Sequence, residues 1–87
     1  MNSREIIEKE FSKILIEVNA PLPSDFSDDM VLLESGLDSL GFAVLITRLE
    51  IECGYDPFSL MEEPFYPRSF GQLVEIYKMF EKNLGLS

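Results

Sequence analysis

Prolines and glycines divide this chain of 87 residues into three segments whose apolar residues recur at the spacing of an α-helix. Helices are predicted at about 4–18, 39–53 and 70–83, with a short helix at about 58–61 inside the second loop. No segment alternates apolar and polar residues over any length, so no strand is predicted. The expected fold is all-α: one domain, 1–87, forming a small bundle of three main helices with a long first loop and a short helix before the last.

Polar residues at the helix starts support these boundaries. Asn2 is followed three residues later by Glu5, and Ser69 by Gln72, and both pairs have the pattern of a capping box. Asp38 stands directly before the second helix and is a strong N-cap residue. We therefore expect all three main helices to begin at a side chain that accepts a backbone hydrogen bond.

Composition excludes several classes of function. Histidine is absent and Cys53 is the single cysteine, so neither a nucleophile–histidine pair nor a cysteine metal cluster can form. Cys53 is expected to act as a small apolar core residue. The net charge of −9 opposes binding to nucleic acid or to anionic membranes, and no apolar run approaches the roughly 18 residues of a membrane span. We expect a cytoplasmic, monomeric protein that is not an enzyme, binds no metal and does not insert stably into membranes.

The second predicted helix is apolar on two sides. One stripe, which we expect to face the core, contains Phe42, Leu45, Ile46, Leu49 and Cys53. The opposite stripe contains Leu40, Val44, Thr47 and Ile51. A helix on the surface of a small bundle needs only one apolar face. Either the first loop covers the second stripe, or these four residues dock a partner protein.

The segment Gly36-Leu37-Asp38-Ser39-Leu40 opens this helix and is the most informative part of the chain. Ser39 falls in the first helical turn, where several backbone N–H groups have no partner within the helix. A phosphate on its oxygen would lie near those donors and near the positive end of the helix dipole. The alternative is that Asp38 and Ser39 serve only as helix-capping residues.

The same segment resembles the Asp-Ser-Leu signature of acyl carrier proteins and their peptidyl relatives, and the similarity of layout extends over most of the chain. The resemblance implies that a phosphopantetheinyl transferase attaches 4′-phosphopantetheine from coenzyme A to Ser39, with Asp38 and Leu40 contacting that enzyme. The arm would carry acyl or aminoacyl groups as thioesters. Partners implied by the resemblance are an acyl or aminoacyl ligase, a ketosynthase or an acyltransferase of a lipid or specialised biosynthetic pathway.

The chain departs from the family on the outer face of the second helix. Fatty-acid carriers have several acidic residues there, whereas this chain has acid only at Glu50 and Glu52 among mainly uncharged positions. The difference favours a discrete carrier dedicated to one pathway over a carrier for general fatty-acid synthesis. The alternative function is a small acidic adaptor that uses a carrier-like fold without the arm.

Both loops contain apolar residues that need an explanation. The first loop is expected to be held to the core by three side chains: Phe26, Val31 and either Leu32 or Leu33. In the second loop, Phe65 and Tyr66 are expected to pack against the bundle within a rigid, proline-rich connection. The alternative is that this second loop shapes a pocket for the acyl group or selects a partner.

Overall fold

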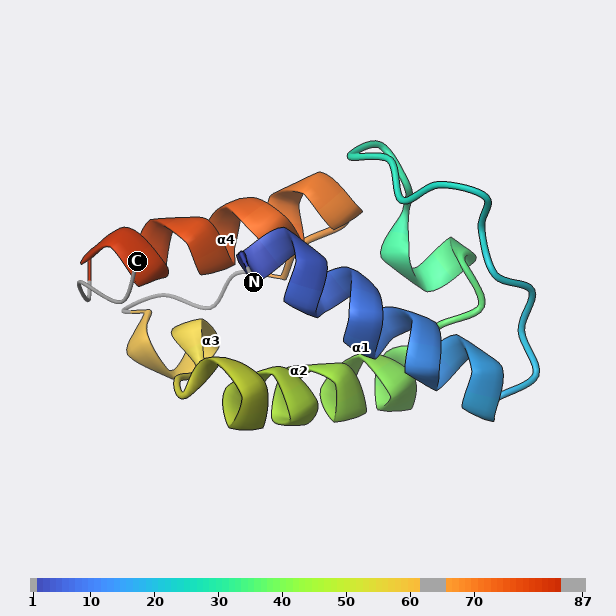
Figure 1. The fold of residues 1–87 in the computed structure, drawn as a ribbon, viewed down its shortest axis with the longest axis horizontal. Coiled ribbons are helices and arrows are strands. Elements are labelled where there is room, and N and C mark those ends of the chain that lie inside the picture. The colour runs from blue at the N-terminus through green and yellow to red at the C-terminus, as the bar shows by residue number, and fades with distance from the viewer. Residues whose placement is uncertain (1, 62–65, 84–87) are drawn as a thin grey trace.

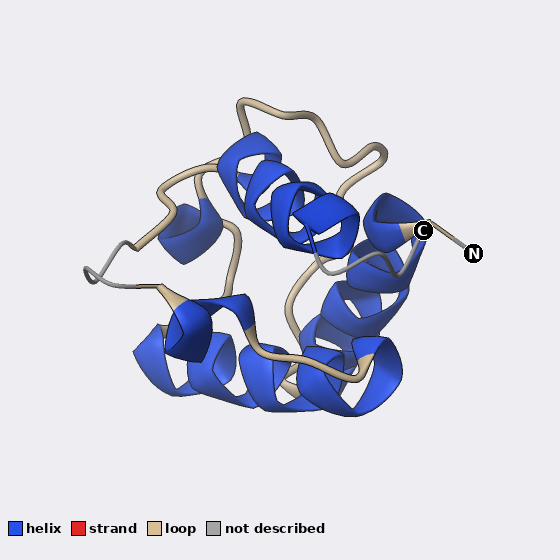
Figure 2. Ribbon diagram, turned by 90° about the vertical axis from the view of Figure 1, so that its left-hand side faces the viewer, coloured by secondary structure: helices blue, strands red, loops and turns tan. Residues whose placement is uncertain are grey.

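The computed structural model of the protein describes residues 2–61 and 66–83. These residues form four α-helices, α1 (Ser3–Glu17), α2 (Ser39–Cys53), α3 (Pro57–Leu60) and α4 (Phe70–Asn83), and a 3₁₀ turn, η1 (Leu32–Glu34). The three long helices surround a common centre, and the first loop runs along the end of the bundle where α2 and α4 begin (Figures 1 and 2). The predicted all-α bundle is confirmed, and the long helices begin and end within one residue of the predicted positions.

Every long helix contributes to one hydrophobic core. Its fully buried members on α1, α2 and α4 are Ile7, Phe11, Ile14, Leu15, Leu45, Leu49, Phe70, Leu73, Val74 and Tyr77. Phe42, Ile46 and Cys53 are partly buried against this core, so the predicted inner stripe of α2 is confirmed. Within the described ranges, no helix combines the length and hydropathy that crossing a bilayer requires.

The predicted caps are present. The Asn2 side chain accepts a hydrogen bond from the backbone N–H of Glu5 at 2.9 Å. At α4, Ser69 Oγ accepts from the N–H of Gln72 at 3.2 Å, while Gln72 Oε1 accepts from the N–H of Ser69 at 3.4 Å. The start of α4 is therefore a complete capping box, as predicted from the sequence.

Two predicted boundaries are corrected. The first helix ends at Glu17, and Val18, expected as its last residue, is an exposed C-cap residue. Asn19 takes a left-handed backbone with φ of 59°, which ends the helix before the prolines. The short helix spans Pro57–Leu60 instead of 58–61, because the Asp56 side chain caps it by accepting from the N–H of Phe58 at 2.9 Å and proline suits the first helical position.

The first loop is held to the bundle by apolar and polar contacts. Leu32, in η1, is buried, whereas Leu33 is 60% exposed. Of the two leucines proposed to hold the loop to the core, Leu32 is therefore the one that does so. The Phe26 ring lies 5.6 Å from Phe11 and 5.3 Å from Phe70, measured between centroids. The loop is therefore anchored where it crosses between α1 and α4.

Arg4 adds a polar clamp that the sequence did not predict. Its guanidinium donates to the Asp28 carboxylate at 2.7 Å and to the Phe26 carbonyl at 2.6 Å. It also lies over the Phe70 ring, 5.2 Å from the centroid. Close by in sequence, Ser3 Oγ donates to Glu81 at 2.6 Å, so the start of α1 is bonded to the last turns of α4.

Candidate functional site

Ser39 is the first residue of α2, and its side chain is exposed. The turn before it is fixed by Gly36, whose φ of 102° is strained for any residue with a side chain. A Cβ atom at this position would also lie only 2.8 Å from the Cβ of Ala20. Leu37 follows and is buried in the core. Gly36 thus packs closely against Ala20, just after the end of α1, and the turn leaves Ser39 exposed to solvent.

The amides around Ser39 are less available than the sequence suggested. The Asp38 carboxylate accepts from the N–H of Gly41 at 2.7 Å, and the Asp38 carbonyl accepts from the N–H of Phe42 at 2.8 Å. Within the described residues, the N–H groups of Ser39 and Leu40 have no acceptor. Two donors therefore remain for a phosphate on Ser39, and the neighbouring carboxylate opposes part of the attraction of the helix end.

An apolar cavity of about 380 Å³ adjoins Ser39. It is lined by residues from η1, from the first turns of α2 and from the segment before α4: Leu32, Leu33, Ser39, Phe42, Ala43, Tyr66 and Pro67. The prediction that Tyr66 packs against the bundle is wrong, because it is 77% exposed and lines this cavity. Phe65, the other aromatic residue of that prediction, lies outside the described residues. A chemical group attached to the Ser39 oxygen would therefore have apolar space beside it.

The second stripe of α2 is mostly open to solvent. Leu40 is 73% exposed, Ile51 is 78% exposed, and Thr47 is exposed as well. The first loop therefore does not cover these three residues. Val44 differs, because it is partly buried against the hydrophobic core. Val44 thus lies at the edge of the core, and its part in docking stays a prediction.

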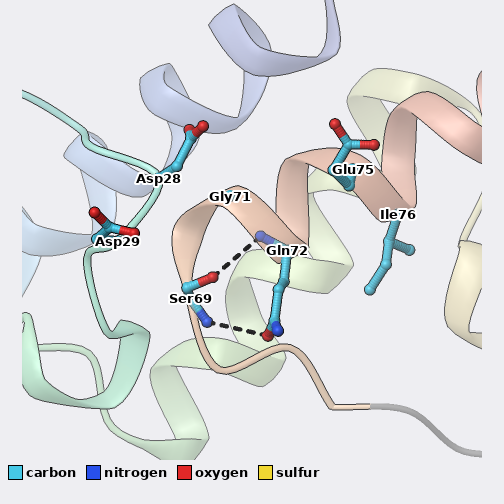
Figure 3. A pocket seen from close by; sticks show the side chains of 7 residues that line it. All are labelled: Asp28, Asp29, Ser69, Gly71, Gln72, Glu75 and Ile76. Carbon is cyan, nitrogen blue, oxygen red and sulfur yellow. Dashed lines mark hydrogen bonds between the residues drawn. The ribbon is translucent and has the colours of Figure 1, made fainter.

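A second hollow lies at the start of α4, as Figure 3 shows. Several of its polar groups stabilise the fold: Ser69 and Gln72 form the capping box, and the N–H of Gly71 donates to the Asp28 carbonyl at 3.0 Å. The Asp28 carboxylate is paired with Arg4. Among the described residues, no group of three histidine, cysteine or carboxylate side chains is close enough to hold a metal ion.

Cys53 occupies the position expected of a core cysteine. Burial, with smaller contributions from Glu81 and Glu52, raises the pKa of its thiol. Since the thiolate is the reactive form, the protonated thiol of Cys53 is a poor nucleophile at neutral pH. Cys53 is therefore less suited to covalent attachment than the exposed hydroxyl of Ser39.

Comparison with protein-family models, with curated proteins and with solved structures found no match to this chain. The functional interpretation rests on the residues around Ser39 and on the resemblance of the segment 36–40 to the carrier signature.

Proposed function

We propose that this chain is a discrete carrier protein, modified with 4′-phosphopantetheine on Ser39, that shuttles acyl groups between partner enzymes. The observation that supports this most directly is the placement of Ser39. Its exposed hydroxyl opens α2 directly beside an apolar cavity. The resemblance of the surrounding residues to the carrier signature supplies the identity of the arm.

Each flanking residue has a distinct part in the modification. Asp38 caps α2 and so keeps Ser39 at the exposed helix end. Leu40 offers an apolar contact to the transferase. Ser39 Oγ forms a bond to the β-phosphorus of coenzyme A, the pyrophosphate bond breaks, adenosine bisphosphate leaves, and a base of the transferase takes the serine proton. Once attached, the group supplies a terminal thiol that carries acyl groups as thioesters.

The cavity and the stripe suggest the cargo and the mode of partner recognition. All cavity-lining residues except Ser39 are apolar or aromatic, which favours an acyl group over a charged aminoacyl group. Leu40, Thr47 and Ile51 form an uncharged exposed surface next to the arm. A ligase, ketosynthase or acyltransferase would recognise this surface mainly through apolar contact.

The exposure of Leu40 and Ile51 also favours a second candidate function, that of an adaptor that uses this stripe without an arm. Such an adaptor would bind its partner equally well with alanine at position 39. The two candidates therefore differ in whether the Ser39 hydroxyl is needed.

Intact mass spectrometry after incubation with coenzyme A and a broad-specificity phosphopantetheinyl transferase tests the proposal. We expect a gain of one phosphopantetheinyl group in the wild type and in Ser24→Ala, which removes another exposed serine. Ser39→Ala, with an unchanged circular dichroism spectrum, should gain nothing. An unmodified wild type would reject the carrier function, and a modified Ser39→Ala would reject the assignment of the attachment site.

A further inference from the structure

The hydroxyl group of Tyr77, in α4, is unusual in its hydrogen bonding. The residue is fully buried, and within the described part of the chain its Oη is the one buried side-chain polar atom without a hydrogen-bond partner. Folded proteins pair the large majority of such atoms, because an unpaired buried hydroxyl lowers stability. Phenylalanine would fill the same space without this loss, so the hydroxyl calls for a functional explanation.

Neighbouring Tyr55 provides a contrast. The two rings lie 5.9 Å apart, and the Tyr55 hydroxyl donates to the backbone carbonyl of Tyr77 at 2.7 Å. The bundle therefore pairs one tyrosine hydroxyl at this place and leaves the adjacent one unpaired. The difference makes Tyr55 a matched control for any experiment on Tyr77.

A series of aromatic rings connects Tyr77 with the cavity beside Ser39. Phe42 lines that cavity, Phe58 lies 6.3 Å from Phe42, and Tyr77 lies 6.2 Å from Phe58, all between centroids. Phe58 is only partly buried and belongs to the four-residue helix α3. Phe58 therefore contacts both the cavity residue Phe42 and Tyr77, whereas Tyr77 itself does not line the cavity.

The surroundings of Tyr77 keep its hydroxyl protonated. Burial raises the pKa of Tyr77, and the nearby Asp56, Cys53, Tyr55 and Glu50 act in the same direction. The protonated group is a hydrogen-bond donor, so its complement is an oxygen acceptor such as a keto or hydroxyl group.

We propose that Tyr77 Oη is a specificity-determining donor that binds an oxygen substituent on the acyl chain carried at Ser39. The inference rests on the proposed carrier function and names its cargo class: oxygenated acyl chains. The chain enters along Phe42 and Phe58, and its oxygen supplies the partner that the hydroxyl lacks. A plain hydrocarbon chain leaves the hydroxyl unpaired and is bound less well.

The test uses the intact protein loaded with hydrolysis-resistant acyl-pantetheine analogues of one chain length, either unsubstituted or with one keto oxygen at successive carbons. In the wild type, we expect one keto isomer to raise the melting temperature by about 4 °C more than the unsubstituted chain. In Tyr77→Phe this preference should vanish, while the unloaded variant should melt about 4 °C above the unloaded wild type. Tyr55→Phe should melt lower in every state and keep the preference for the keto isomer.

Three results would overturn the inference: equal melting temperatures for all analogues in the wild type, a preference retained in Tyr77→Phe, or an unloaded Tyr77→Phe that melts below the wild type. The last would mean that the hydroxyl is already paired, for example with a bound water. Failure of Ser39 to accept phosphopantetheine in the mass measurement rejects the carrier function and this inference together. Modification of Ser39 with any of the three results rejects the inference alone.

Discussion

The helices α2 and α4 differ by one residue in length and use their apolar side chains differently. The apolar residues of α4 that are buried are Phe70, Leu73, Val74, Ile76 and Tyr77. In α2 only Leu45 and Leu49 are fully buried, and Leu40 and Ile51 extend into solvent. Core packing therefore explains most of the apolar residues of α4. It does not explain the exposed apolar residues of α2. The unexplained part lies on the helix that presents Ser39.

The largest expected effect is a difference in stability between substitutions of a buried and of an exposed apolar residue. Leu73→Ala in α4 should lower the free energy of unfolding by about 2–5 kcal/mol, because it leaves a cavity in the core. Ile51→Ser in α2 should change it by no more than about 0.5 kcal/mol, because the side chain is already exposed. Urea unfolding of both variants measures the difference.

The same Ile51→Ser variant should bind a cognate ligase or ketosynthase less well while keeping its melting temperature. Leu73→Ala serves as the reference for loss of stability. A fall in stability of similar size in both variants would mean that Ile51 belongs to the core in solution, and the contrast between the helices would disappear.

The caps of the two helices give a smaller effect. Asp38→Ala should cost about 1 kcal/mol, because it removes a charged acceptor at the positive end of α2. Ser69→Ala should cost about 0.5 kcal/mol, since its bond is longer and Gln72 still accepts from the N–H of Arg68 at 2.7 Å. Thermal unfolding of the two variants checks the order.

Asp38→Asn separates the cap from the contact with the transferase. Asparagine caps nearly as well as aspartate, so the stability of Asp38→Asn should stay close to that of the wild type. If Asp38 also contacts the transferase, modification of Ser39 should slow in this variant. An unchanged rate would leave Asp38 with the capping role alone.

The smallest effect concerns the ion pair that joins α2 to α1. The Arg48 guanidinium donates to both oxygens of Glu17, at 2.8 and 2.7 Å, and these hydrogen bonds lower the pKa of the Glu17 carboxyl below its ordinary value of 4.5. A lowered pKa in the folded state stabilises the protein above pH 4.5, and this stabilisation is lost as the pH falls through the folded-state pKa.

Urea unfolding of the wild type and Glu17→Gln across this pH range provides the measurement. The wild type should be slightly more stable at neutral pH, and the two should converge in acid. Because the pair is exposed, added salt should also reduce the difference. A gap that is independent of both pH and salt would contradict the assignment to this ion pair.

The structural features that the sequence predicts correctly depend on local patterns. Helix periodicity and the caps at Asn2, Asp38 and Ser69 depend on neighbours within one or two turns, so they can be read without the fold. Arg4 illustrates the limit, because its partners Phe26 and Asp28 are more than twenty residues away and no spacing rule relates them.

The features of the candidate site also fall into two groups: those that the sequence predicts and those that depend on the fold. The sequence predicts the position of Ser39 at a helix start, whereas the cavity beside it depends on Tyr66 and Pro67, which only the return of the chain before α4 places there. Periodicity assigns Val44 to the outer surface because it gives the direction of a side chain along one helix and does not show how far the core extends. The unpaired hydroxyl of Tyr77 has no sequence signal at all, since its state depends on every neighbouring element.

The hydrogen bond between Ser3 and Glu81 has a consequence for the order in which the protein assembles during synthesis. The two residues are 78 positions apart, so this contact forms only after the segment that includes Glu81 has left the ribosome. Phe70, which the rings of Phe11 and Phe26 contact, also emerges late. Until then α1 and α2 have no α4 to complete their core, and the nascent chain exposes the side chains that α4 later covers. Ser39 is thus translated before α4, the last helix of the core that surrounds its own helix, has been made.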